Sequence, residues 1–127
     1  MTENEIAKVI VDAAFKIHTQ IGPGLLESAY EAILVHELTK RGLRVVTQHP
    51  IEMTYEGVRI EIAFKADLIV EGKVIVELKS LEKLAPVHAR QLLTYLRLTN
   101  LRLGLLINFG TAQIKNGIVR VVNGLVA

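Results

Sequence analysis

The sequence predicts an α/β fold in which a mixed central β-sheet is flanked by α-helices. Three observations support this prediction. Apolar residues recur at helical spacing from Thr2 to Ile21 and from Leu25 to Lys40, whereas residues 58–79 alternate with the period of two that is typical of strands. A third helix is expected from Pro86 to Leu98, because proline is common at a first helical position. The segment that follows, Leu103 to Phe109, has the composition of a strand buried on both sides.

The size and composition of the chain indicate one globular domain spanning residues 1–127. Half of the residues are hydrophobic and 22% are charged, which is typical of a protein with a packed core. No apolar run approaches the roughly 20 residues that span a bilayer. The acidic N-terminal sequence MTENEIAK lacks the basic and apolar regions of a signal peptide. We therefore expect a cytoplasmic protein with no membrane partner.

Several kinds of chemistry are excluded or disfavoured by composition and motif. The absence of cysteine excludes disulfides, thiolate metal sites and a cysteine nucleophile. The four histidines lack zinc-ligand spacing, and neither a glycine-rich phosphate loop nor a G-x-S-x-G motif is present. The net charge of +2 permits a nucleic-acid partner without requiring one. With three Tyr, three Phe and no Trp, the chain is poorly suited to stacking on single-stranded bases.

The first two helices are separated by the break Gly22-Pro23-Gly24. Thr2 and Glu5 have the spacing of a capping box at the start of the first helix. In the second helix, Glu27 falls at the margin of the apolar stripe and not on the outer face with Glu31. The residues alone leave two interpretations of Glu27 open with equal support. It is either a carboxylate favoured by the helix dipole or one that meets a partner in a functional site.

The remaining strands are expected on both sides of two turns. Pro50 lacks an amide donor, so the strand that it begins or borders is expected at a sheet edge. His49 and Pro50 are interpreted as a loop, and Asn116-Gly117 as a hairpin turn. The predicted strands are Leu43 to Gln48, Ile51 to Tyr55, Val58 to Val70, Ala112 to Lys115 and Ile118 to Val122.

The two strands around Gly72 form a predicted hairpin whose loop decides the direction of the Asp67 side chain. A two-residue loop would place Asp67 on the face opposite Glu77. A three-residue loop would pair Ile69 with Lys73 and place Asp67 on the same face as Glu77. We favour the three-residue loop, because Glu71 is a poor residue for a type I′ turn. That register also unites the apolar residues of both strands on one face: Ile62, Phe64, Ala66, Leu68, Val70, Val74, Val76 and Leu78.

In the favoured register Asp67, Glu77 and Lys79 lie on one face of the sheet. Neighbouring carboxylates raise each other's pKa and reduce stability unless a cation lies between them. Two such oxygen ligands suit Mg²⁺ or Mn²⁺, and a lysine beside them can position a water or offset charge on a phosphate. The alternative is an ordinary ion pair between Lys79 and Glu77 on a solvated face. The local spacing alone favours this alternative.

Asp67 followed by Glu77-Leu78-Lys79 on a hairpin resembles the core of the PD-(D/E)xK nuclease superfamily. Three segments in the same order also resemble the small bacterial family known as GxxExxY proteins. The motif that gives this family its name corresponds to Gly24-Leu25-Leu26-Glu27-Ser28-Ala29-Tyr30. The other two segments are Ala66 to Lys79 and Gln91 to Leu96. The resemblance covers nearly the whole chain, from about Ile6 to Phe109.

The resemblance implies a restriction-endonuclease-like core and a nuclease that depends on Mg²⁺ or Mn²⁺. Its substrate would be nucleic acid, with DNA favoured over RNA. The metal would be held by Asp67, Glu77 and the carbonyl of Leu78, with support from Glu27. Lys79 would position the nucleophilic water and stabilise the transition state.

The helix after the Glu-x-Lys strand supplies further expected site residues. In the RecB-like branch of the superfamily, a Gln-x-x-x-Tyr motif on this helix flanks the active site. Here Gln91 and Tyr95 match that pattern, so the resemblance implies that they support the site or contact phosphate. His88 on the same helical stripe and Lys65 on the strand of Asp67 are weaker candidates for substrate contacts.

Other functions remain open at this point. The chain could be a non-catalytic module that uses a nuclease scaffold to bind nucleic acid or protein, or a structural subunit of a larger complex. A domain of this size has few elements for substrate selection, so a protein partner or a homodimer is a further expectation. An exposed apolar surface near Pro50 or on the last hairpin would mark such an interface.

Overall fold

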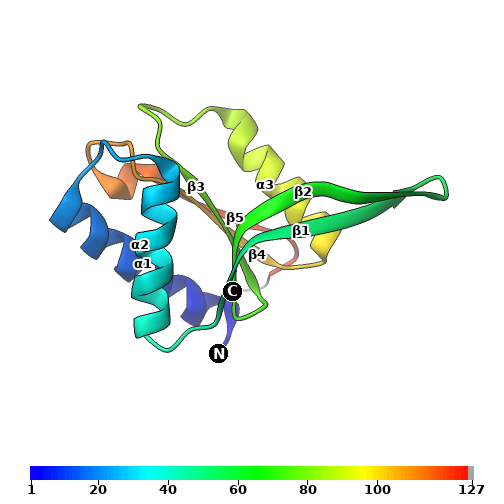
Figure 1. The fold of residues 1–127 in the computed structure, drawn as a ribbon, viewed down its shortest axis with the longest axis horizontal. Helices are drawn as coiled ribbons and strands as arrows, with labels where there is room; N and C mark the ends of the chain where they lie inside the picture. Colours follow the sequence, from blue (N-terminus) through cyan, green and yellow to red (C-terminus); the bar gives the residue numbers. More distant parts are fainter. Residues whose placement is uncertain (126–127) are drawn as a thin grey trace.

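The computed structural model describes residues 1–125 and shows a mixed sheet with helices on both faces (Figure 1). None of the helices in this range is long and apolar enough to cross a membrane. The elements, in chain order, are α1 (Glu3–Ile21), α2 (Glu27–Lys40), β1 (Val45–Tyr55), β2 (Val58–Val70), β3 (Val74–Lys79), α3 (Pro86–Thr99), β4 (Leu103–Asn108), the short 3-10 helix η1 (Ile114–Gly117) and β5 (Ile118–Val122).

The five strands lie in the order β1-β2-β3-β4-β5. Only β3 and β4 are parallel, and α3 is the connection between them; the other neighbours are antiparallel. Every residue of β4 is buried, as its apolar composition predicts. The predicted α/β class, with a mixed sheet between helices, is therefore confirmed, as is the edge position of the strand that contains Pro50.

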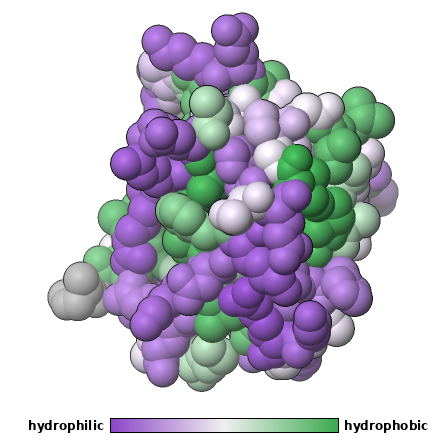
Figure 2. Space-filling model, turned by 90° about the vertical axis from the view of Figure 1, so that its left-hand side faces the viewer, coloured by the Kyte–Doolittle hydropathy of each residue, from purple (hydrophilic) through white to green (hydrophobic). Residues whose placement is uncertain are grey.

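Two apolar clusters fill the two faces of the sheet. The larger one joins α1 and α2 to β2, β3 and β4 and includes Tyr30, Leu68 and Phe109. The smaller one lies beneath α3 and includes Ala66, Ile75 and Leu92. On the side of the molecule where α1, α2 and η1 lie, polar residues cover most of the surface, with apolar residues between them (Figure 2). The sheet thus has two separately packed faces.

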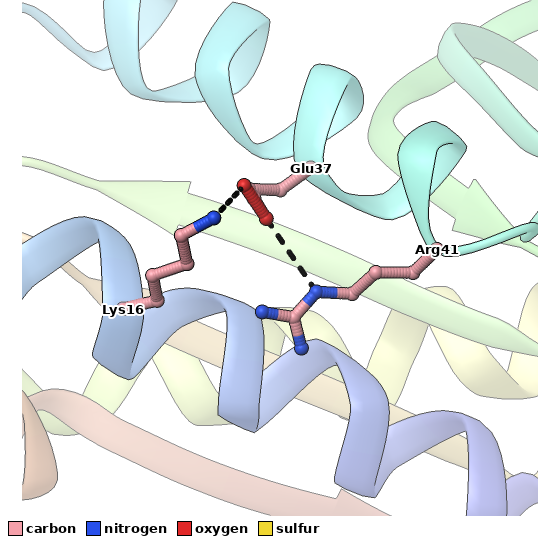
Figure 3. A network of polar contacts seen from close by, with 3 residues as sticks. All are labelled: Lys16, Glu37 and Arg41. Atoms are coloured by element: carbon pink, nitrogen blue, oxygen red, sulfur yellow. Dashed lines mark hydrogen bonds and ion pairs between the residues drawn. The ribbon is translucent and has the colours of Figure 1, made fainter.

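Helices α1 and α2 are tied together by a buried acidic residue. Glu37 on α2 accepts a 2.6 Å hydrogen bond from Nζ of Lys16 on α1, and its other oxygen lies 3.5 Å from Nε of Arg41 (Figure 3). The hydrogen bond from Lys16 lowers the pKa of Glu37, the largest of several causes. The predicted capping box at the start of α1 is also present, with Thr2 and Glu5 each accepting from the other's amide. The contact between Lys16 and Glu37 therefore joins α1 to α2.

One continuous strand replaces the two strands that were expected from Leu43 to Tyr55. His49 and Pro50 lie within β1, so their assignment to a loop is wrong. The chain bends at Gln48, whose φ of 48° is left-handed, and then continues to pair with β2. The local sequence predicts a break at Pro50, but β1 is an edge strand and needs no amide there.

The register of the β2–β3 hairpin differs from both predicted loops. Val70 pairs with Val74, and Lys73 donates to the carbonyl of Val70. Glu71 and Gly72 both have positive φ, 53° and 65°, so the argument against Glu71 at such a position is wrong. Contacts with Arg44, the residue before β1, hold Glu71 in this strained conformation: its amide donates to the carbonyl of Arg44, and its carboxylate accepts from the amide of Arg44.

The predicted continuous apolar face along β2 is also wrong. Leu68 and Val70 pack against α1 and α2, but Ala66 and Phe64 pack beneath α3, on the other face. Ile62 is 55% exposed and joins neither cluster. The change of face falls at Asp67, which lies opposite Gln48 and its left-handed φ, whereas the register shift of the β1–β2 ladder lies further along, between Ile51 and Met53.

The predicted C-terminal hairpin at Asn116-Gly117 is absent from the described chain. Residues 114–117 form η1, and β5 pairs directly with β4. Gly117 is needed for close packing: a Cβ at this position would lie 2.4 Å from the carbonyl oxygen of Asn108. Gly117, which the sequence suggests as a turn residue, is therefore needed in the fold because its backbone lies against that of Asn108.

Candidate active site

Asp67 on β2 and Glu77 on β3 lie side by side, one position beyond the last ladder pair, Leu68–Val76. The amide of Asp67 donates a 3.2 Å hydrogen bond to Oε1 of Glu77, and the amide of Leu78 donates a 2.9 Å bond to Oδ2 of Asp67. The two carboxylates lie close together, although the register that brings them there differs from the predicted one. The antiparallel strands thus bind each other's acidic side chains through main-chain amides.

Glu77 has a strongly perturbed charge equilibrium. Burial raises its pKa to about 8, and the negative charge of Asp67 acts in the same direction. The hydrogen bond from the Asp67 amide and the charge of Lys79 act in the opposite direction but do not prevail. Without a cation beside the pair, Glu77 therefore binds a proton far more readily than an ordinary glutamate does.

Lys79 is half-buried at the end of β3 and does not neutralise Glu77 directly. Within residues 1–125, no ion pair joins Lys79 to a carboxylate. The ordinary ion pair between Lys79 and Glu77 that the spacing favours is therefore not formed.

The backbone after Lys79 is held by fully buried Asn108, whose side chain accepts from the amide of Leu81 and donates to its carbonyl.

Glu27 is exposed in the first turn of α2, where the turn before the helix sets its position. Tyr30, one turn later, is fully buried and stacks on Phe109 with ring centroids 4.5 Å apart. Its hydroxyl donates a 2.5 Å hydrogen bond to the carbonyl of Gly22 and accepts one of 3.3 Å from the amide of Leu25. The Tyr30 side chain therefore holds the break between α1 and α2 and, through it, the start of α2.

A cavity of about 250 Å³ brings the start of α2 next to β2 and β3. It is lined by Glu27, Ser28, Glu31, Gln48, Asp67 and Leu78. Three of the predicted site residues thus meet in one cavity, while Glu77 and Lys79 lie beside it. Glu31 is half-buried in this lining, so its predicted position on the outer face is wrong.

Gln48 was not singled out by the sequence, yet it links the two walls of this cavity. Its Nε2 donates to Oε1 of Glu31 at 2.7 Å and to Oδ1 of Asp67 at 3.2 Å. The left-handed backbone at Gln48 directs its side chain to these partners. Gln48 stands at the end of a predicted strand and belongs to no chemical motif. Its role is therefore visible only from its contacts in the folded chain.

The α3 residues divide between the site and the surface. Tyr95 stacks on Phe64 with a centroid distance of 3.7 Å, and its pKa is raised by burial and then by the charges of Glu77 and Asp67. Gln91 is exposed. His88 accepts a hydrogen bond from the amide of Ala85 and so caps the helix. Exposed Lys65 lies two residues before Asp67 on β2.

The donor groups fit a hard divalent cation. Oxygen is the only donor element among the Asp67 and Glu77 carboxylates and the Leu78 carbonyl, as Mg²⁺ and Mn²⁺ prefer. Burial and the charge of Asp67 raise the pKa of Glu77, so a cation beside the pair would favour its ionised form. Within residues 1–125, no three Asp, Glu or His side chains are gathered closely enough to form a complete metal site. The two carboxylates could therefore hold a cation together with Glu27, which lines the same cavity as Asp67.

Comparison with known proteins adds one match. A family model described as the PD-(D/E)XK nuclease superfamily matches residues 4–121. No curated protein and no solved structure matches the chain significantly.

Proposed function

The chain belongs to the PD-(D/E)XK nuclease superfamily, and on that premise we propose that it is a magnesium-dependent nuclease that cleaves phosphodiester bonds, in DNA rather than RNA. Mn²⁺ would serve in place of Mg²⁺. The observation that carries the proposal is the contact between Asp67 and Glu77 beside a cavity that Glu27 also lines. We further propose that the chain falls in the GxxExxY group and the RecB-like branch.

In this proposal the residues divide into metal ligands and groups that act on substrate. Asp67, Glu77 and the carbonyl of Leu78 hold the cation, and Glu27 supports it directly or through water. When bound, the cation neutralises the charge that develops on the phosphate. Lys79 orients the attacking water and adds positive charge beside the phosphate.

Two residues of α3 complete the proposed site. Tyr95 is the better supported of them, because its pKa responds to both carboxylates and its ring is fixed on Phe64. Gln91, one turn earlier on α3, is exposed and is proposed to contact the substrate backbone. Both groups position substrate; neither transfers a proton in this scheme.

A cleavage assay tests the function directly. Wild-type protein is incubated with supercoiled plasmid, linear duplex DNA and RNA in buffers with Mg²⁺, Mn²⁺ or EDTA. We expect metal-dependent cleavage that Asp67→Asn and Lys79→Ala each reduce at least about 100-fold, as for the loss of a group that stabilises a transition state. Lys83→Ala is the matched control, because Lys83 is exposed and four residues from Lys79.

Two outcomes would contradict the proposal. Equal activity in wild type, Asp67→Asn and Lys79→Ala would assign the cleavage to a contaminant. Nucleic-acid binding without cleavage would indicate a non-catalytic binding module if calorimetry also detects no Mn²⁺ uptake, or only uptake that Glu77→Gln does not abolish.

A further inference from the structure

Helix α2 begins at an N-cap residue that cannot cap it. This residue is Leu26, whose side chain has no hydrogen-bonding group and is 77% exposed. The first amides of a helix have no partner within the helix, and helix ends fray unless other groups hold them. Glu27 is the first residue of α2. Contacts from elsewhere in the fold therefore have to fix its position.

Leu25, two residues before Glu27, is held by both of its main-chain polar groups. The hydroxyl of Tyr30 accepts from its amide at 3.3 Å, and the hydroxyl of Ser80 donates to its carbonyl at 2.7 Å. Ser80 stands 55 residues after Leu25 in the chain and directly follows Lys79. Leu25 and Ser80 also line the same surface groove. The Ser80 side chain therefore joins the segment that carries Lys79 to the residues that precede Glu27.

The neighbours of Ser80 are fixed to the end of β4. The amide of Phe109 donates to the carbonyl of Lys79 at 2.9 Å. The side chain of Asn108, which is fully buried, accepts from the amide of Leu81 and donates to its carbonyl, each at 2.9 Å. A buried side chain whose polar groups are bonded in this way makes a rigid anchor. Ser80 is therefore a firm support, because the residues on both sides of it are bonded to the end of a buried strand.

β3 forms one wall of the candidate cavity, and Glu27 lies on another. β3 pairs with β4 along a parallel ladder from Val74 to Lys79, so its residues are fixed. Leu78 lines the cavity together with Glu27, and Ser80 lies two residues beyond Leu78. Glu27 is exposed, at the start of a helix that lacks a capping side chain at its N-cap. The bond from Ser80 to Leu25 thus ties the less restrained wall of the cavity to the fixed one.

We propose that Ser80 is a positioning residue for Glu27: its hydroxyl, supported by the end of β4, binds the Leu25 carbonyl and so sets the distance of Glu27 from the metal ligands on β2 and β3. The inference rests on the proposed function, in which Glu27 supports the cation. Ser80 itself contacts neither metal nor substrate and acts through the main chain of Leu25. Groups that orient a metal ligand in this indirect way typically contribute about 10- to 100-fold to metal affinity.

Calorimetric titration with Mn²⁺ tests whether Ser80 acts through Glu27. Ser80→Ala should weaken Mn²⁺ affinity about 10-fold, and Ser80→Thr, which keeps the hydroxyl, should restore it. In the Glu27→Gln background Ser80→Ala should have no further effect, because the ligand that it positions is gone. Thr94→Val is the matched control. It removes a hydroxyl that donates to the carbonyl of Arg90 within α3, and it should leave Mn²⁺ affinity unchanged.

The metal-free protein gives a readout that does not depend on activity. Spin labels are attached at Leu26→Cys and Lys83→Cys, two exposed positions in a chain that has no natural cysteine. Pulsed EPR should give a narrow distribution of label distances in this parent protein. The distribution should broaden with Ser80→Ala and become narrow again with Ser80→Thr, because only the hydroxyl ties Leu25 to the segment after β3.

The outcomes separate this inference from the proposed function. Unchanged label distances in Ser80→Ala, or Mn²⁺ affinity equal to that of wild type, would overturn the inference alone. Additive effects of Ser80→Ala and Glu27→Gln on Mn²⁺ affinity would also overturn it, since Ser80 would then not act through Glu27. A wild-type protein that neither takes up Mn²⁺ nor cleaves DNA would overturn the proposed function, and this inference with it.

Discussion

The main-chain amide of Asp67 donates a 3.2 Å hydrogen bond to Oε1 of Glu77, which places two carboxylates together where β2 bends away from β3. A bond of this kind stabilises the ionised carboxylate, but burial and the charge of Asp67 outweigh it and raise the pKa of Glu77 to about 8. The fold therefore keeps Glu77 where ionisation of its carboxyl group is unfavourable. Such costs are common where a protein binds a cation or a substrate.

The first prediction concerns the stability of the metal-free protein as a function of pH. The pKa of Glu77 is higher in the folded protein than in the unfolded chain, so the folded state binds more protons between about pH 4.5 and about pH 8. The contribution of Glu77 to the free energy of unfolding should fall as pH rises through this window. Thermal unfolding of wild type and Glu77→Gln in EDTA measures it, and the variant should gain stability relative to wild type at the upper end.

The exposed carboxylate Glu61 provides the control for this measurement. Glu61→Gln should show the same difference in Tm between low and high pH as wild type, because the Glu61 side chain is exposed. The same pH dependence of Tm in EDTA for Glu77→Gln and wild type would contradict this prediction. It would show that Glu77 is ionised in the metal-free protein at no electrostatic cost.

The second prediction separates activity from stability at Gln48. A non-glycine residue with left-handed φ costs roughly 1–2 kcal/mol, which glycine avoids. Gln48→Gly should remove this cost and also the hydrogen bonds to Glu31 and Asp67, so stability is retained while nuclease activity falls severalfold. Urea unfolding and plasmid cleavage measure the two effects.

Glu56 is the matched control for Gln48, since it has nearly the same φ, 47°, in the turn between β1 and β2. Glu56→Gly should raise stability without lowering activity. Unchanged cleavage by Gln48→Gly would show that the side chain does not orient Asp67.

The third prediction concerns the hydroxyl of Tyr30. Tyr30→Phe keeps the ring stacked on Phe109 but removes the bonds to Gly22 and Leu25. We expect a loss of about 1 kcal/mol of stability, together with a severalfold loss of activity because the start of α2 and Glu27 are less well fixed. Tyr55→Phe changes an exposed residue at the end of β1 and should affect neither property. A Tyr30→Phe protein with normal activity would exclude the positioning role.

The fourth prediction concerns the Glu37 network between α1 and α2. Glu37→Gln removes the ion pairs to Lys16 and Arg41 and should lower Tm without changing the cleavage rate per folded molecule. Because the pKa of Glu37 is lowered in the fold, its stabilising effect should be present above the unfolded pKa and decline as pH falls. Glu52→Gln breaks the exposed pair with Arg59 and should matter much less. Equal Tm changes in the two variants would contradict this account.

The sequence by itself determined the helices, the buried strand β4, the α/β class and the acidic pair on neighbouring strands. Local periodicity is enough for these features, because side chains return to the same face every 3.6 residues in a helix and every two residues in a strand. The superfamily resemblance rested on segments of this kind, and the family match over residues 4–121 confirms it.

The tertiary structure decided the features that depend on contacts between distant segments. The turn at Glu71 adopts positive φ because Arg44, just before β1, bonds both its amide and its carboxylate. Gly117 is not in a hairpin turn but lies against the carbonyl of Asn108, where a Cβ would collide. Gln48 takes a left-handed φ within β1, and its side chain donates to both Glu31 and Asp67, which lie on other elements. No local pattern contains these outcomes, because the hydrogen-bonding partner that selects each conformation lies far away along the chain.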